Sequence, residues 1–196
     1  MGTTSTLHTV TSKDGTTIAV DVAGSGPPIV LISGGSVDRG ANAGLAAVLQ
    51  SEFTTYNYDR RGRGDSGDTP PYAVAREIED IEAVIELAGG KAHLYGSSSG
   101  AGLGLEAAAA GAPVDRLVMW EPPYNLDPAG RPPADSVEQL DRMVAEGDRP
   151  HPVDEAVHPV RRPDPEEVGR HVVDLAVQVG QAGGPEVGGL ADDGRG

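Results

Sequence analysis

Residues 94–104 read LYGSSSGAGLG, with three serines between Gly96 and Gly100. An apolar run, residues 91–96, comes directly before the serines, and a stretch rich in alanine and glycine follows them. The pattern Gly-x-Ser-x-Gly between a strand and a helix is typical of a sharp turn that holds its central serine in a strained backbone conformation. Its glycines leave room for the close backbone approach that the turn needs. The stretch therefore predicts a nucleophilic serine at Ser98.

The same serines allow three other interpretations. A flexible linker is disfavoured because an apolar strand and a helical pattern abut the glycines directly. A phosphate-binding loop needs a lysine before its closing serine or threonine, or the spacing G-x-G-x-x-G. Here Gly100, Gly102 and Gly104 alternate and no lysine follows. A packing turn without chemistry stays open as the third alternative.

Short apolar runs alternate with helical patterns around this turn. Asp14-Gly15 is a tight-turn signal that predicts a hairpin ending in the alternating strand 16–22, and the continuously apolar residues 27–33 predict a strand covered on both faces. Further strands are predicted at 53–59, 91–96 and 115–121, and helices at 74–90 and 99–111. Strands that alternate with helices indicate an α/β fold with a mostly parallel sheet and helices on both faces.

Composition excludes several classes of protein. The 196 residues suit one domain, and the net charge of −15 disfavours nucleic acid and anionic lipid as partners. We expect no membrane span, no leader segment and, because cysteine is absent, a cytoplasmic location. The basic cluster of Arg60, Arg61 and Arg63 is flanked by aspartates, so we expect a solvated turn there. A small-molecule substrate is the expected partner, and the oligomeric state is left open.

Three more motifs accompany the serine turn: VLISGGS at 30–36, YDRRGRGDSG at 58–67 and LVMWEPPY at 117–124. Together they resemble the α/β-hydrolase superfamily, in the branch that holds esterases, cofactor-free haloperoxidases and epoxide hydrolases. The resemblance implies an α/β-hydrolase fold and attack of the serine on an ester or related acyl group. It also implies an oxyanion hole formed by the backbone N–H groups of Gly35 and Ser99. The glycines of the arginine turn are expected to be structural, and no cofactor or metal is implied.

The resemblance implies a histidine base and an acid after the nucleophile in the chain. His151, His158 and His171 follow Ser98 in the correct order, but none lies between a recognisable strand and a terminal helix. Glu121 ends the last predicted strand, where some members of the superfamily place the acid; a simple capping role is the alternative. The other two histidines, at positions 8 and 93, are expected to be ordinary strand residues. We therefore expect a hydrolase impaired by a missing base and acid.

The sequence changes character near Gly147. We expect the hydrolase core at 1–134, the start of a cap-like helix at 135–147, and a loosely ordered Pro/Gly-rich tail at 148–196, so that the fold is incomplete at its C-terminus. Either the chain is a natural short variant that lost its triad, or it is read out of frame beyond Gly147. The use of 13 arginines but 2 lysines indicates GC-rich coding and favours the second account. A catalytically silent binding module, or an enzyme of non-hydrolytic chemistry, are the alternative functions.

Overall fold

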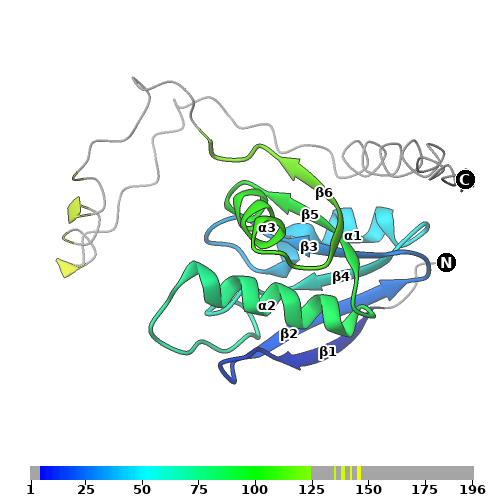
Figure 1. Cartoon of the computed structure of the whole chain (residues 1–196), viewed down its shortest axis with the longest axis horizontal. Helices are drawn as coiled ribbons and strands as arrows, with labels where there is room; N and C mark the ends of the chain where they lie inside the picture. Colours follow the sequence, from blue (N-terminus) through cyan, green and yellow to red (C-terminus); the bar gives the residue numbers. More distant parts are fainter. Residues whose placement is uncertain (1–4, 125–134, 136–137, 140–141, 143–144, 147–196) are drawn as a thin grey trace, which may run out of the picture.

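The computed structural model describes residues 5–124 and, beyond them, positions 135, 138, 139, 142, 145 and 146. Its described part contains one sheet with helices packed on it (Figure 1). In chain order the elements are β1 (Thr6–Thr11), β2 (Thr17–Gly24), β3 (Pro28–Ile32), the 3₁₀ helix η1 (Arg39–Asn42), α1 (Ala43–Leu49), β4 (Thr54–Tyr58), α2 (Val74–Leu87), β5 (Ala92–Ser97), α3 (Ser99–Ala109) and β6 (Val114–Trp120). The predicted strands and the second predicted helix are confirmed to within two residues. The first predicted helix ends at Leu87, just before Gly89 and Gly90, whose positive φ values stop it as the sequence predicts.

The strand order in the sheet is β1-β2-β4-β3-β5-β6. The predicted hairpin is present, with β1 antiparallel to β2, and β2 is antiparallel to β4. The other neighbours are parallel: β3 with β4, β3 with β5, and β5 with β6. The carboxyl ends of β4, β3, β5 and β6 therefore meet at one edge of the sheet. Loops that follow these strands can bring residues distant in the sequence together at this edge.

The sheet is covered on both faces, as the continuous apolar run of β3 predicts. Val30 and Ile32 pack with residues of α2 and α3 on one face. Ile29 and Leu31 point to the other face, where Leu45 of α1 lies. Figure 1 shows α2 and α3 on the near side of the sheet and α1 behind it. The predicted mostly parallel sheet with helices on both faces is confirmed.

Two elements that the sequence analysis did not name are η1 and α1. They occupy the connection between β3 and β4, and the side chain of Asp38 caps η1 by accepting a hydrogen bond from the Gly40 N–H at 2.8 Å. Four described positions of the cap-like segment, Glu138, Gln139, Arg142 and Ala145, are helical, and two, Asp135 and Glu146, are turn residues. No helix among the described residues is long and apolar enough to cross a bilayer. The predicted tail, 148–196, lies outside the described residues, and the division of the chain into the three predicted segments stays a prediction.

Candidate active site

Backbone strain is concentrated at the carboxyl edge of the sheet. Three non-glycine residues of the described chain have a positive φ: Ser36 at 58°, Ser98 at 51° and Glu121 at 47°. They follow β3, β5 and β6, which are adjacent parallel strands. Such conformations cost free energy and persist only where the surrounding structure holds them, which happens most often at functional sites. This edge is therefore the candidate active site.

Ser98 has the geometry expected of a nucleophile turn. It lies between β5 and α3 with φ 51° and ψ −123°, and its side chain makes no capping hydrogen bond to the helix. Its N–H donates to the carbonyl oxygen of Trp120 at 2.9 Å, which fixes the turn to the end of β6. The residue is exposed. The strained backbone conformation predicted for Ser98 is confirmed by its positive φ, and the Ser98 hydroxyl is available at the site.

The flanking glycines are required by close backbone contacts. A Cβ atom on Gly96 would lie 2.6 Å from the Ala101 Cα, and one on Gly100 would lie 2.5 Å from the carbonyl oxygens of Ile32 and Ser33. Real Cβ atoms do not approach backbone so closely, so neither position accepts a larger residue without movement. The start of α3 is thereby packed directly on the end of β3.

The loop after β3 lies against the serine turn. A Cβ atom on Gly34 would be 3.4 Å from the Ser98 Cβ, and one on Gly35 would be 3.6 Å from the Ser99 Oγ. Neither the Gly35 N–H nor the Ser99 N–H has a hydrogen-bond acceptor among the described residues. Two unpaired backbone donors beside an exposed serine are the components that an oxyanion hole requires, and the roles of Gly35 and Ser99 stay predictions.

The two histidines among the described residues, His8 and His93, lie far from Ser98. His8 lies in β1, and His93 lies in β5 five residues before Ser98, about 16 Å away along an extended strand. Burial lowers the pKa of His93, and its ring contacts Asp115 at 3.4 Å and the edge of Phe53. Neither histidine can reach Ser98. The candidate bases His151, His158 and His171 lie outside the described residues.

Glu121 is at the correct edge of the sheet for an acid. It follows β6 directly, is exposed, and is one residue beyond Trp120, whose carbonyl binds the Ser98 N–H. Burial, and to a lesser extent the negative charge of Glu121, raise the pKa of Tyr95 to about 12. The role of Glu121 as the acid stays a prediction.

The arginine turn after β4 differs from the expected solvated turn. Arg60 and Arg61 are each only 5% exposed. Arg60 donates to both carboxylate oxygens of Glu77, at 2.6 and 2.5 Å, and Arg61 donates to both of Asp80, at 2.8 and 2.7 Å. Both acids lie on the buried side of α2, where the sequence pattern had placed only its apolar residues. The expectation of a solvated turn is wrong, because these two bidentate pairs bury the guanidinium groups.

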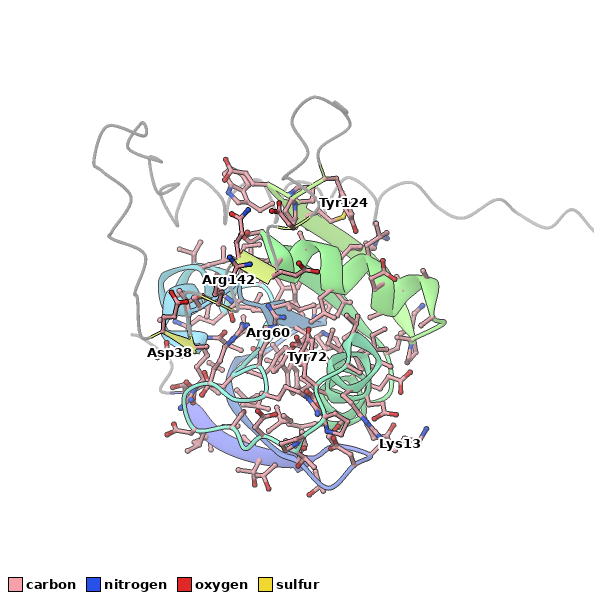
Figure 2. The ribbon with its side chains drawn as sticks, turned by 90° about the vertical axis from the view of Figure 1, so that its left-hand side faces the viewer. Lys13, Asp38, Arg60, Tyr72, Tyr124 and Arg142 are labelled. Carbon is pink, nitrogen blue, oxygen red and sulfur yellow. The ribbon has the colours of Figure 1, made fainter. Side chains whose placement is uncertain are left out.

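Arg60 also reaches the candidate site. Its Nη1 lies 3.0 Å from the Ser99 Oγ and 3.3 Å from the Ser33 carbonyl oxygen. Burial disfavours the charge on Arg60, but hydrogen bonds to Glu77 outweigh burial and raise the pKa of the guanidinium. Tyr72 donates its hydroxyl to Glu77 at 3.0 Å, and Figure 2 shows Arg60 and Tyr72 close to each other. Sequence reasoning missed this network.

The glycines of the arginine turn are structural in the way expected. Gly62 and Gly64 have φ values of 71° and 52°, and a Cβ on Gly64 would collide with the carboxylate of Asp59. The Asp59 carboxylate accepts hydrogen bonds from the Asp65 N–H at 2.8 Å and from the Arg39 N–H at 2.7 Å. Among the described residues, no group of three histidines or carboxylates is placed to hold a metal ion.

A sheet of this topology with a strained serine between strand and helix defines the hydrolase class of α/β proteins. The sequence profile described as "Alpha/beta hydrolase family" matches residues 29–192, which is most of the chain. The chain therefore belongs to the alpha/beta hydrolase family. The matched range extends beyond Gly147, and the frame-shift account of that segment stays a prediction.

Known proteins similar to this chain agree with the family. An alpha/beta hydrolase from Sphaerobacter thermophilus is 55% identical with a TM-score of 0.69, over 71% of this chain and 55% of that one. An esterase from Rhodococcus sp. is 27% identical with a TM-score of 0.54, over 58% of this chain and 44% of that one. N-formylmaleamate deformylase from Pseudomonas putida is 36% identical over 108 residues, 52% of this chain and 40% of its own length. The chain thus spans 40% to 55% of the length of these relatives.

Proposed function

We propose that the chain is a serine hydrolase of small-molecule esters or related acyl compounds, with Ser98 as the nucleophile. The observation that carries the proposal is the backbone of Ser98, at φ 51° and ψ −123°, which presents an exposed hydroxyl beside the loop of Gly34 and Gly35. A strand-to-helix turn of this conformation is costly and serves to present a nucleophile.

The proposed reaction is acyl transfer through an acyl-enzyme. The Ser98 oxygen attacks the carbonyl carbon of the ester, and its proton passes to a base. The carbonyl π electrons move to the oxygen, where the N–H groups of Gly35 and Ser99 stabilise the oxyanion; each such donor is worth about 3 kcal/mol. The carbon–oxygen bond to the alcohol breaks, the alcohol takes the proton, and water then releases the acid by the same steps.

The base and acid are the part of the proposal that rests on sequence alone. His151, His158 and His171 are the candidate bases, and Glu121 at the edge of the site is the candidate acid. A serine without its base retains only the oxyanion hole and binding, which together give about 10³ to 10⁴ over water. We therefore expect slow turnover.

Esters are the proposed substrates because the Rhodococcus relative is an esterase. The deformylase relative supports an amide-like acyl group as a further substrate of the same chemistry. A silent binding module on the same scaffold is the alternative; the described residues place no histidine near Ser98, which is the observation that favours it. A cytoplasmic location also stays a proposal, drawn from the cysteine-free sequence.

The test is the hydrolysis of short p-nitrophenyl esters by the full chain and by Ser98→Ala. We expect slow, saturable turnover that is lost in Ser98→Ala. Separate His151→Ala, His158→Ala and His171→Ala variants identify the base as the one whose replacement removes the activity. Turnover that is unchanged in Ser98→Ala contradicts the proposal, and complete absence of turnover favours the binding module.

A further inference from the structure

We propose that Arg60 is a positioning residue that holds the two halves of the oxyanion hole at the correct separation. This inference rests on the proposed hydrolase function. The two donors are the N–H group of Gly35, in the loop after β3, and the N–H group of Ser99, the first residue of α3, which is 64 residues later in the chain. The side chain of Arg60 contacts both the loop after β3 and the start of α3.

The first contact orients the Gly35 donor. Arg60 Nη1 lies 3.3 Å from the carbonyl oxygen of Ser33 and 3.5 Å from that of Gly34, and Arg63 Nη1 donates to the Gly34 oxygen at 2.9 Å. The C=O and N–H of one trans peptide point in opposite directions. Since the Gly34 carbonyl is held by the arginines, the Gly35 N–H of the same peptide is directed away from them. A hydrogen bond at the carbonyl also polarises that N–H and makes it a stronger donor.

The second contact fixes the Ser99 donor. Arg60 Nη1 donates to the Ser99 Oγ at 3.0 Å, so the residue that carries the second N–H is tied to the same nitrogen atom as the first loop. The Ser99 side chain is in turn the nearest atom to a Cβ placed on Gly35, at 3.6 Å. One guanidinium nitrogen therefore sets the distance between the two donors.

The guanidinium itself is immobilised from the opposite side. The Glu77 carboxylate accepts hydrogen bonds from Nε and Nη2 of Arg60 in a bidentate pair. It also accepts one from the Tyr72 hydroxyl at 3.0 Å. The pair is buried, with side-chain exposures of 6% for Arg60 and 3% for Glu77. The planar guanidinium group can bind a carboxylate with two nitrogens and still donate from the third to the loop of Gly34 and Gly35. A lysine ammonium group lacks this geometry.

The chain contains a matched pair that makes the inference testable. Arg61 and Asp80 form a bidentate buried pair of the same chemistry, one residue further along the turn. The remaining donors of Arg61 go to Asp14 and to the Arg76 carbonyl oxygen, away from the serine turn. Arg60→Lys and Arg61→Lys therefore each lose a bidentate ion pair. Only Arg60→Lys also loses the contacts with the loop of Gly34 and Gly35 and with Ser99.

The experiment compares an ester with the matching thionoester, whose sulfur accepts hydrogen bonds from the oxyanion hole more weakly than oxygen does. The kcat/KM of the ester divided by that of the thionoester measures how strongly the oxyanion hole stabilises the transition state. We expect Arg60→Lys to lower kcat for the oxygen ester about 10- to 100-fold, with KM within about threefold, and to reduce the ratio by a similar factor. Arg61→Lys should leave the ratio within about twofold.

Ser99→Ala provides a second variant that leaves the buried ion pair intact. It removes one acceptor of Arg60 without exposing a charge, and we expect a smaller decrease of the ratio in the same direction. The backbone amide resonances of Gly35 and Ser99, recorded by NMR without substrate, give a readout that does not depend on turnover. Both should shift in Arg60→Lys and stay in place in Arg61→Lys.

The outcomes separate the two proposals. An equal decrease of the ratio in the two lysine variants, or an unchanged ratio in Arg60→Lys, overturns the positioning role of Arg60 while leaving the hydrolase function standing. If the unmodified chain shows no Ser98-dependent hydrolysis, the proposed hydrolase function is wrong. The amide resonances alone then test the positioning role of Arg60. Unshifted Gly35 and Ser99 resonances in Arg60→Lys then overturn the positioning role.

Discussion

Gly100→Ala tests whether the packing of α3 on β3 sets the geometry of the site. The added methyl group would lie 2.5 Å from the carbonyl oxygens of Ile32 and Ser33, whereas ordinary contacts begin at 3.4 Å, so the two backbones must separate by about 0.9 Å. Overpacking of this kind costs about 1 to 3 kcal/mol of unfolding free energy. A misplacement of about 1 Å between catalytic groups costs about 10²-fold in rate.

The matched control is Gly102→Ala on the same helix. Among the residues that the structure describes, its methyl group would meet nothing closer than the Tyr124 hydroxyl oxygen at 3.5 Å, and alanine favours a helix over glycine by up to about 1 kcal/mol. Urea unfolding and p-nitrophenyl ester kinetics on both variants provide the assay. We expect Gly100→Ala to be less stable and about 10²-fold less active, and Gly102→Ala to be as stable as the unmodified chain or more so. Equal stability and activity of the two variants would refute the reasoning.

Two further predictions concern strain and pH. Ser98→Gly should be more stable than Ser98→Ala by about 1 kcal/mol in thermal unfolding, because glycine relieves the positive φ, while both lose hydrolysis; equal melting temperatures contradict the strain. Burial opposes the charge of Glu77, but the hydrogen bonds and charge of Arg60 outweigh it and hold the pKa of Glu77 below its usual range. Because the folded pKa is the lower one, this stabilisation is present above the unfolded pKa of about 4.3 and is lost as pH falls through the folded pKa. Unfolding free energies at pH 5 and below should thus depend less on pH in Glu77→Gln, and an unchanged dependence would count against the pair.

Local patterns were sufficient to predict the sheet and the serine turn. The alternation of residues 16–22, the continuous run of β3 and the glycines around Ser98 each reflect a constraint within a few residues of the chain. The positive φ of Ser98 was predictable for the same reason, since the glycines on both sides are needed only if backbones approach closely there. The proximity of Gly35 to Ser99 followed from the resemblance of the motifs to a known family.

Two features could not be predicted because their causes are distant or weak. The short helix α1 has the sequence AGLAAVL, whose small residues and lack of charge give no clear helical face. The burial of Arg60 depends on Glu77, 17 residues later in the chain, whose charge suggests a solvent-exposed position although its spacing of four from Ile81 places it on the buried face of α2. A signal was present in the sequence: Glu77 and Asp80 are spaced by three, so they share a face of α2 and match the consecutive arginines at 60 and 61.

The central claim is that Ser98 is a nucleophile with a formed oxyanion hole, and covalent labelling tests it most directly. A fluorophosphonate phosphonylates a serine by losing fluoride, and the resulting adduct occupies the oxyanion hole. Because the oxyanion hole stabilises this reaction even where the base is missing, Ser98 should react slowly but before any other serine of the chain. Incubation of the full chain with the probe, followed by mass spectrometry of its peptides, should give one phosphonylated residue, Ser98, and Ser98→Ala should give none. An unmodified Ser98 in the folded chain, or labelling that persists in Ser98→Ala, would contradict the account.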